Sequence, residues 1–558
     1  MTKNKVKIVG IRPPETNLTL SGYGGVNGMI SVAPIRPKVP SLGLFHVGTV
    51  LKQELKNEGY DSDISFEDMA SSEPETLSPY AEDFSKYSKV PYGPGVIHKM
   101  LRGKSLSSLE NTVQDSDVCF ISSLFTAGAT STAQTMETIK KHNPNVILLI
   151  GGRDAQYRPE WYLQKGADAV FLGQAEGLVG KVTASLLNGR QVNFPGVATR
   201  LNIGNLGKTK IVDRERLESL GVNSLNKSTT TISRNTSLEQ ETFPNFDLII
   251  LSEYSESCDG ALPSGVTGPV MWYQTSVGCP RSCDFCPSAR DPYFSLSASR
   301  VDRMLEYYRG AGIRTILSAE DNFLARLLNK NELGQEPEQE IVDIMKLIRL
   351  HGLAHEFSNG LEVGLLINRD GSLREHLIEN LFAHDRTESG VIGTYRMYWP
   401  IETLIGRDRF KKLVKKKDHY RILDAVLQTG IPEIVFNSIL FSDYGSREID
   451  LFRRGLGEFC DWMIKHQRQT KWSLPIFHEL PLPGSKSYEG LLSRSFDINL
   501  HPELWAVPIN PTNGAHYSYD ELYSIKRKLM EEFDLAGLKE WDMLGRYGTT
   551  THTNENRQ

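Results

Sequence analysis

Short β-branched runs alternate with amphipathic stretches over residues 1–200, and this alternation restricts the fold more than any other feature of the sequence. Runs typical of buried strands occupy residues 6–11, 61–66, 117–122, 145–150 and 167–172. The intervening segments carry apolar residues at helical spacing. Parallel strands joined by helices form an open sheet that binds ligands beyond the carboxyl ends of its strands. We therefore predict an α/β fold that begins with a doubly wound, Rossmann-like domain over residues 1–200.

A second series of strands and helices occupies residues 266–484. Its candidate strands cover residues 270–276, 314–317, 395–398, 434–439 and 472–477. Several βα units in one series favour a full or partial barrel of the TIM type, here a partial (β/α)6 barrel. Residues 201–265 are polar without clean periodicity, so we expect a linker or crossing segment there. Residues 485–558 carry one good helix, at 518–533, and are expected to form a small C-terminal helical region.

The composition excludes several classes of protein. Sixty-three basic and 68 acidic side chains give a formal net charge of −5, which disfavours nucleic-acid binding by bulk charge. Apolar runs such as residues 146–150 are far shorter than the ~18 residues that a membrane span needs. Six cysteines among 558 residues do not make a disulfide framework, and no secretory signal is visible. We therefore expect a cytoplasmic protein that binds neither nucleic acid nor membrane.

Three of the six cysteines lie together, in a C-x3-C-x2-C spacing formed by Cys279, Cys283 and Cys286. The segment follows a predicted strand, and Pro287 disfavours helix at Cys286 and keeps the segment a loop. Three thiolates on one loop can each bind a different iron of a [4Fe–4S] cube, which leaves the fourth iron open to a small molecule. A structural zinc site fits less well because it normally takes four ligands. Three unrelated buried cysteines are the remaining alternative.

A C-x3-C-x2-C loop after the first strand of a barrel resembles the signature of the radical S-adenosylmethionine (radical SAM) family. Phe285 matches the aromatic residue that usually precedes the third cysteine, and we count it with the SAM-binding residues. The resemblance covers residues 269–484. It implies that SAM chelates the open iron and that one electron from the cluster cleaves SAM to methionine and a 5′-deoxyadenosyl radical. It also implies an external one-electron reductant of the flavodoxin or ferredoxin kind.

Two further segments resemble SAM-contacting parts of the same family. Residues 316–323 read ILSAEDNF and resemble the second barrel strand with its acidic end, where Glu320 or Asp321 would hold the SAM ammonium. The alternative for this pair is a helix N-cap and a solvated acid. Glu402 lies where relatives read GIES, although the surrounding residues depart from that pattern, and it is a candidate contact to SAM or substrate. Residues 481–485 resemble the turn that closes these barrels.

Residues 1–200 resemble the cobalamin-binding domain that precedes the barrel in one branch of the radical SAM family. The resemblance rests on PSLGL at residues 40–44, on serines after the third strand, on GGRDA after the fourth and on GQAE after the fifth. Glycine after a strand lets the backbone approach a flat ligand, and serine hydroxyls can bond its polar tail. The residues that we predict to bind cobalamin are Ser122, Ser123, Gly151, Gly152, Gly173 and Glu176.

The N-terminal region also departs from that family. Asp154 replaces the histidine of GGxHA, and no D-x-H-x-x-G occurs, so no motif supplies a histidine to the lower face of cobalt. A domain that binds a nucleotide, or that binds nothing, remains an alternative. A Rossmann dinucleotide loop is disfavoured because residues 22–28 do not read G-x-G-x-x-G.

The two resemblances together imply cobalamin, SAM and a [4Fe–4S] cluster as cofactors. The leading hypothesis is a methyltransferase that passes a SAM-derived methyl group by way of methylcobalamin to a carbon of a small-molecule or peptide-derived substrate, such as a natural-product precursor. The second is a cyclase or ring-rearranging enzyme that uses the same cofactors without methyl transfer. The third is a non-catalytic iron–sulfur sensor. Fold alone does not separate the first two.

Overall fold

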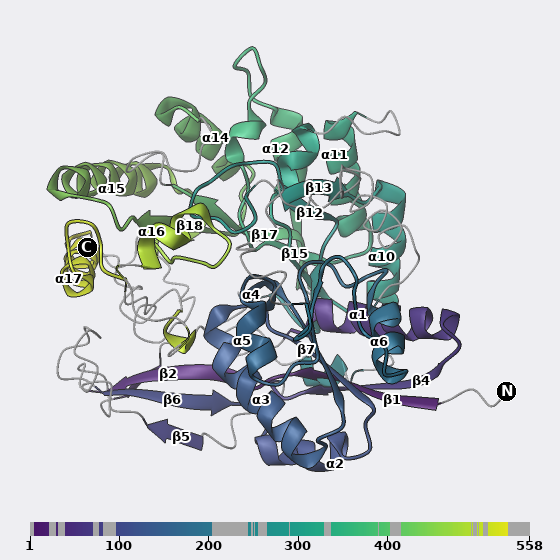
Figure 1. Cartoon of the computed structure of the whole chain (residues 1–558). Helices are drawn as coiled ribbons and strands as arrows, with labels where there is room; N and C mark the ends of the chain where they lie inside the picture. Colours follow the sequence, from purple (N-terminus) through teal and green to yellow (C-terminus); the bar gives the residue numbers. More distant parts are fainter. Residues whose placement is uncertain are drawn as a thin grey trace.

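Two α/β bodies and a C-terminal extension make up the protein, as a computed structural model shows (Figure 1). The N-terminal sheet and its helices form one body, the barrel forms the other, and the C-terminal segments run alongside. The structure describes residues 5–21, 29–31, 39–70, 78–81, 96–202, 244–246, 249, 251–254, 265–289, 291–328, 336–388, 390–401, 414–492, 494, 499, 502–505 and 512–533.

The N-terminal sheet has the order β10-β9-β8-β7-β1-β4 and is parallel except for β10. Its strands are β1 (Lys5–Arg12), β4 (Asp61–Asp68), β7 (Val118–Ser122), β8 (Ile147–Gly151), β9 (Ala169–Phe171) and β10 (Val197–Ala198). The chain moves outward from β1 to β4 and then returns to β7 on the other side of β1, so the strand order reverses between β1 and β7. The prediction of a doubly wound domain is confirmed.

Alternation of side chains along the strands divides the apolar residues between two helical layers. One core joins Val6 and Ile8 of β1 to α1 (Leu42–Asn57) and α6 (Val179–Leu187). The other joins Val9 and Ile11 to helices on the opposite face. Those helices are α2 (Leu109–Val113), α3 (Ala129–His142) and α5 (Pro159–Gln164).

A small antiparallel sheet extends from this domain, and the sequence analysis did not predict it. Its order is β3-β2-β6-β5, and Figure 1 shows β2 continuing the direction of β1. The strands are β2 (Glu15–Ser21), β3 (Met29–Ser31), β5 (Ser78–Ala81) and β6 (Val96–Arg102). Pairing β2 with β6 joins residues far apart in the chain, which local periodicity does not reveal.

The second body is a partial barrel with six strand positions, which confirms the predicted architecture. The parallel order is β11-β14-β15-β17-β18-β19, with β20 also on β18 and β16 (His384–Thr387) antiparallel to β17. The parallel strands are β11 (Val270–Tyr273), β14 (Thr315–Ser318), β15 (Ala354–Phe357), β17 (Gly390–Pro400), β18 (Glu433–Leu440), β19 (Lys471–Ser473) and β20 (Ile476–His478). The sequence analysis missed β15, because its four residues AHEF neither alternate in polarity nor include a β-branched residue.

Helices cover the outside of the barrel, and the N-terminal body contacts its other face. Met271 and Tyr273 pack into the core beneath the helices, whereas Val270 contacts Val39, which precedes α1. The helices are α10 (Ala298–Gly310), α11 (Pro337–Leu350), α12 (Glu375–Leu381), α14 (Lys416–Gln428) and α15 (Ser446–His466). No described helix is long and apolar enough to cross a membrane.

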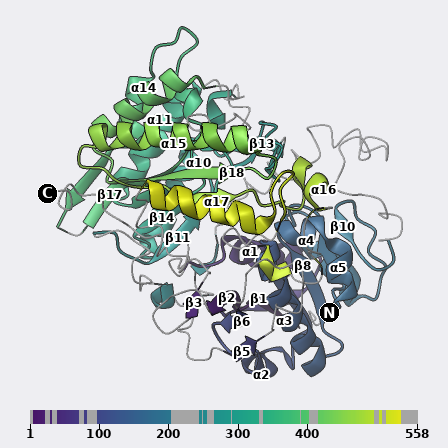
Figure 2. The same cartoon turned by 90° about the vertical axis from the view of Figure 1, so that its left-hand side faces the viewer.

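The C-terminal extension touches both bodies. It contains α16 (Lys486–Leu492), the short helix η9 (Pro502–Leu504) and α17 (Tyr519–Glu532). α17 begins with a capping box between Ser518 and Glu521, and it lies within the helix predicted at residues 518–533. Figure 2 shows α17 running along α15 and β18 of the barrel, while η9 lies against α3 of the N-terminal body.

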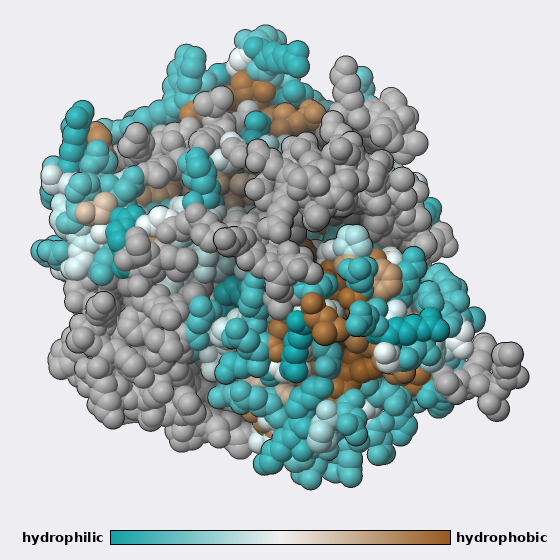
Figure 3. Space-filling model, in the orientation of Figure 1, coloured by the Kyte–Doolittle hydropathy of each residue, from teal (hydrophilic) through white to brown (hydrophobic). Residues whose placement is uncertain are grey.

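The predicted domain boundaries at residues 200, 265 and 484 stay a prediction. Most of the expected linker, including residues 203–243, lies outside the described residues. On the surface drawn in Figure 3, apolar residues gather over the N-terminal body where Figure 1 places β7, α1 and α6.

Candidate functional site

The three clustered cysteines lie in the loop of a hairpin next to the barrel. This hairpin joins β12 (Ser276–Cys279) to β13 (Asp291–Ser295), and the two strands pair antiparallel. Cys279 and Cys283 are buried, and Cys286 is half-buried. The amide of Cys286 donates to the carbonyl of Cys283 at 3.2 Å, which makes a tight turn between them.

All three thiols are free of disulfides, so each can act as a thiolate ligand. Among the described residues, no three His, Cys, Asp or Glu side chains converge on a single metal ion. A [4Fe–4S] cube instead takes each thiolate at a separate corner. The donor set of three cysteines on one compact loop fits such a cube.

Glu320, a predicted SAM contact, holds the chain that leads into this hairpin. Its carboxylate accepts hydrogen bonds from the amide of Thr275 at 3.0 Å and from the hydroxyls of Thr275 and Ser276. Burial raises the pKa of the Glu320 carboxyl, against the opposing effects of Arg326 and of these hydrogen bonds. Both carboxylate oxygens therefore engage the segment just before the cysteines.

Asp321 joins the two ends of the cysteine loop. Oδ2 accepts from the amide of Gly278 at 3.0 Å, and Oδ1 accepts from the hydroxyl of Ser288 at 2.6 Å. Gly278 immediately precedes the first cysteine, and Ser288 follows the third. One carboxylate thus closes the loop at its base.

Asn322 contacts the loop itself, and the sequence analysis did not single it out. Its Nδ2 lies 3.7 Å from Sγ of Cys279 and 2.8 Å from Oε2 of Glu362. The only signal in the sequence was its place in the EDNF segment. Glu362 gave no signal, because it approaches from the end of another barrel strand.

The remaining barrel predictions fall in different places. Phe285 packs edge-on against Phe441 at a centroid distance of 5.9 Å, so its ring belongs to the edge of the barrel core. Glu402 lies outside the described residues. In the closing turn, Gly484 has a φ of +91°, and a Cβ there would lie 2.3 Å from the ring of Tyr157. Residue 484 is glycine because Tyr157 of the N-terminal body packs directly onto this turn.

Four of the predicted cobalamin residues meet at the carboxyl ends of β7 and β8. The amide of Ser123 donates to the carbonyl of Gly151 at 2.7 Å. Gly152 has a φ of +103°, and a Cβ there would lie 2.3 Å from the carbonyl oxygen of Ser123. Ser122 ends β7 beside Gly151. The two remaining residues follow β9, where Glu176 lies 3.4 Å from His46 of α1.

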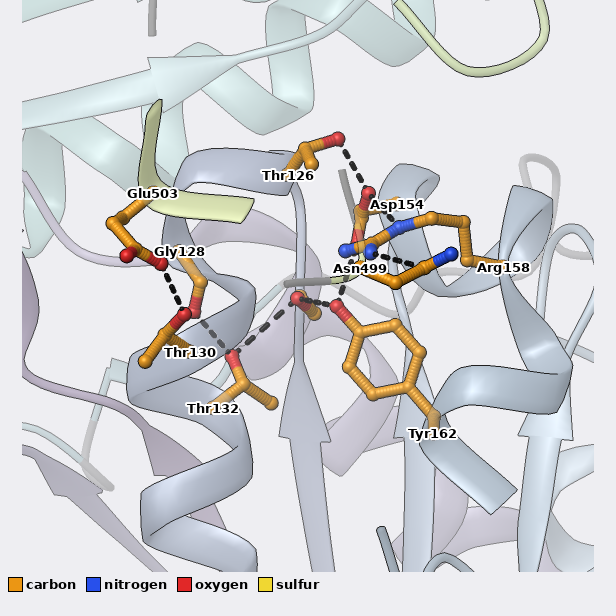
Figure 4. A network of polar contacts seen from close by, with 10 residues as sticks. Thr126, Gly128, Thr130, Thr132, Asp154, Arg158, Tyr162, Asn499 and Glu503 are labelled. Carbon is orange, nitrogen blue, oxygen red and sulfur yellow. Dashed lines mark hydrogen bonds and ion pairs between the residues drawn. The ribbon is translucent and has the colours of Figure 1, made fainter. Parts of the chain in front are cut away.

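Asp154, which replaces the expected histidine, lies at the centre of a buried polar network (Figure 4). Its carboxylate accepts from Arg158, whose Nη2 is 2.6 Å away, and from the hydroxyls of Thr126 and Tyr162. Tyr162 also contacts the hydroxyl of Ser123 at 2.6 Å. Burial raises the pKa of the Tyr162 hydroxyl well above its ordinary value, and the Asp154 carboxylate adds to the rise. The network ties together the loops after β7 and β8.

The C-terminal extension joins the same network. Asn499 Oδ1 accepts from Arg158 at 3.3 Å, and Glu503 accepts from the hydroxyl of Thr130 at 2.6 Å. Figure 4 shows Asn499 beside Arg158 and Asp154, and Glu503 at Thr130 of α3, on the other side of the network. The sequence analysis treated the extension as separate from this domain.

A short helix of the N-terminal body connects the two candidate cofactor loops. This helix, α4 (Arg153–Tyr157), begins directly after Gly152. Arg153 donates to the hydroxyl of Ser288 at 3.0 Å and lies 3.7 Å from Asp321. At its other end, the Tyr157 hydroxyl donates to the carbonyl of Pro287 at 3.1 Å. Both ends of α4 therefore contact residues 287–288, just after the third cysteine, and the glycine loop (Gly151–Gly152) directly precedes the first of these contacts.

Comparison with known proteins agrees with this geometry. The family model of the B12 binding domain matches residues 104–182, which include β7, β8 and β9. A solved structure of the cobalamin-dependent S-adenosylmethionine radical enzyme OxsB with aqua-cobalamin bound matches with a TM-score of 0.51 and 14% identity. The match covers 95% of this chain and 62% of that chain. This chain has the fold of a cobalamin-dependent radical SAM enzyme.

That fold and the B12 binding domain together imply three cofactors: cobalamin, a [4Fe–4S] cluster and SAM. SuiB of Streptococcus suis bound to the precursor peptide SuiA matches at 12% identity over 39% of this chain and 40% of that chain, with a TM-score of 0.25. HydG, a maturase of the [FeFe]-hydrogenase, matches at 12% identity over 50% and 55%, with a TM-score of 0.26. The comparison with curated proteins gave no match.

Proposed function

We propose that this chain is a cobalamin-dependent radical SAM methyltransferase that transfers a methyl group from SAM to a carbon atom of a small-molecule or peptide-derived substrate. The observation that carries the proposal is α4 (Arg153–Tyr157), which begins at the glycine loop of the B12-type domain and contacts the cysteine loop at both of its ends. Methyl transfer needs both cofactors within reach of one substrate. A sensor that only held a cluster would not need the second loop beside it.

The roles of the chain's own residues follow from their positions. Cys279, Cys283 and Cys286 would hold the cluster, while Asp321 keeps the loop closed at its base. Gly151 would let the backbone approach the flat cobalamin ring, because a Cβ there would meet no atom of the chain within 4 Å. Gly152 would hold this loop against Ser123, because a Cβ there would meet the carbonyl oxygen of Ser123 at 2.3 Å. When bound, these cofactors supply the radical and the methyl carrier, and the protein supplies position.

The substrate would bind between the two bodies, beyond the carboxyl ends of the barrel strands. Ligands in such folds bind at that edge. We infer an external one-electron reductant of the flavodoxin or ferredoxin kind, because each reductive cleavage of SAM would consume one electron, which the cluster must receive from outside the chain. Thiolate ligands require a reducing compartment, which supports a cytoplasmic location for the working enzyme.

Cofactor content is the first test. The full chain is purified anaerobically from cells supplied with cobalamin, and corrinoid and iron per chain are read by visible absorption and iron assay. About one corrinoid and four irons per chain are expected. Iron without corrinoid would leave an ordinary radical SAM enzyme and overturn the methyltransferase proposal.

Fate of the methyl group is the second test. SAM with a labelled methyl group, a reductant and candidate substrates should yield labelled product and S-adenosylhomocysteine. Formation of 5′-deoxyadenosine with unlabelled, rearranged product would favour the cyclase instead. Failure to turn over SAM under any reducing condition would favour the sensor.

A further inference from the structure

We propose that Asn322 is a positioning residue that raises the reduction potential of the cluster, and that Glu362 opposes it. This inference rests on the proposed cluster at Cys279, Cys283 and Cys286. It goes beyond that proposal because it concerns how easily the cluster accepts an electron. The chain of contacts runs from Cys279 through Asn322 and Glu362 to Arg281.

The Asn322 amide is oriented by its surroundings. Nδ2 carries two N–H groups, one directed at Sγ of Cys279 (3.7 Å) and the other at Oε2 of Glu362 (2.8 Å). Turning the amide over would set Oδ1 against the carboxylate of Glu362, which is repulsive. Oδ1 is buried, and no described residue donates a hydrogen bond to it. Glu362 thus selects the orientation that presents an N–H group to the sulfur.

Glu362 is itself held in place by the cysteine loop. Its side chain is 1% exposed, and Arg281 contacts both oxygens, at 2.6 Å from Nη2 and 3.0 Å from Nε. Arg281 lies between Cys279 and Cys283, so the loop carries the counter-ion of the carboxylate that orients Asn322. Two-point contact between guanidinium and carboxylate fixes direction as well as distance.

The two side chains act on the cluster with opposite signs. An N–H group that donates to a cluster sulfur stabilises the reduced form more, because reduction places more negative charge on the sulfurs. A buried carboxylate nearby disfavours added negative charge and lowers the potential. Removing Asn322's donor should therefore make reduction harder, and removing Glu362's charge should make it easier.

The test is a potentiometric titration of the full chain with its cluster reconstituted, followed by electron paramagnetic resonance of the reduced cluster without SAM. For Asn322→Leu we expect the ratio of reduced to oxidised cluster at a fixed potential to fall about tenfold, which for one electron is about 59 mV. Glu362→Gln removes the charge but keeps an oxygen that can accept from Asn322, so for this variant we expect a shift in the opposite direction. Asn359→Leu is the matched control, since Asn359 donates to the carbonyl of Glu320 and not to sulfur; its potential should stay unchanged.

Each outcome separates a tuning role from a structural one. Wild-type potential in an iron-replete Asn322→Leu protein, or shifts of the same sign in both variants, would overturn the inference. If Asn322→Leu does not retain iron, Glu362→Gln, which keeps the side-chain size, decides: an unchanged potential overturns the inference. A wild-type chain without a cluster would overturn the proposed function, and the inference with it.

Discussion

The polar network around Asp154 and the segment Glu320 to Asn322 occupy equivalent places in two different sheets. Each lies just beyond the carboxyl ends of parallel strands, where such folds bind their ligands. Around Asp154 the polar groups bond to one another, and the neighbouring Leu124 and Phe125 stay more than half exposed. Around Asn322 the polar groups hold the chain on either side of three thiols.

This difference matches the two kinds of ligand. Cobalamin is large and flat, so its domain would present backbone and apolar surface and use its buried polar groups to keep the loops rigid. A cluster bonds covalently to sulfur, so its polar neighbours position the thiolates and change how well the sulfurs hold negative charge. Mutations in either region test whether the two differ in this way.

The largest effect should come from a cysteine. Cys283→Ala removes one corner ligand, so we expect loss of the cluster absorbance and of all SAM cleavage. Corrinoid binding should persist, because the B12-type domain has its own core. Iron assay and visible absorption of the same sample measure both. Loss of corrinoid together with iron would show that the two sites do not assemble independently.

Asp154→Ala should follow in size. It leaves the buried Arg158 guanidinium without its carboxylate, and removing one partner of a buried ion pair costs about 3–5 kcal/mol. Denaturant unfolding followed by circular dichroism measures the change in the free energy of unfolding. The control is Glu137→Ala, whose exposed pair with Lys165 is worth about 0–1 kcal/mol. Equal effects from the two variants would contradict the buried network.

A smaller loss is expected from Gly152→Ala. A Cβ at this positive φ would meet the carbonyl oxygen of Ser123, and strain of this kind costs about 1–3 kcal/mol. We expect weaker corrinoid binding with iron content unchanged, measured on one preparation. Gly43→Ala is the control, because its Cβ would meet no atom within 4 Å. Normal corrinoid affinity in Gly152→Ala would remove this glycine from the cobalamin loop.

Acid should weaken the barrel gradually. Burial lowers the pKa of His355 to about 3 and that of His419 to about 4, from an ordinary value of 6.5. Below pH 6.5 each imidazole is neutral in the folded protein and gains a proton on unfolding. Their contribution to the free energy of unfolding is therefore complete above pH 6.5 and is lost as the pH falls toward 4 for His419 and toward 3 for His355. Each group contributes a slope of up to about 1.4 kcal/mol per pH unit. Denaturant midpoints at pH 7, 6 and 5 should show a shallower slope in His419→Phe than in the wild type.

Local sequence pattern was enough to predict most of the two folds. The doubly wound sheet, the partial barrel and the cysteine loop follow from periodicity, glycine positions and spacing, all of which act over a few residues. The sequence analysis missed the antiparallel sheet because β2 and β6 pair across most of a domain's length. It missed the short strand β15 because its four residues lack a pattern of their own.

The sequence by itself determined most of the elements and the grouping of three thiols on one loop, because hydrophobic period and cysteine spacing are local properties. Tertiary structure decided which side chains surround those thiols. Asn322 meets Glu362 across 40 residues, and Arg153 meets Ser288 across 135. Such contacts form only after the strands that carry them are paired and packed, and no short-range pattern encodes which loop ends will then be neighbours.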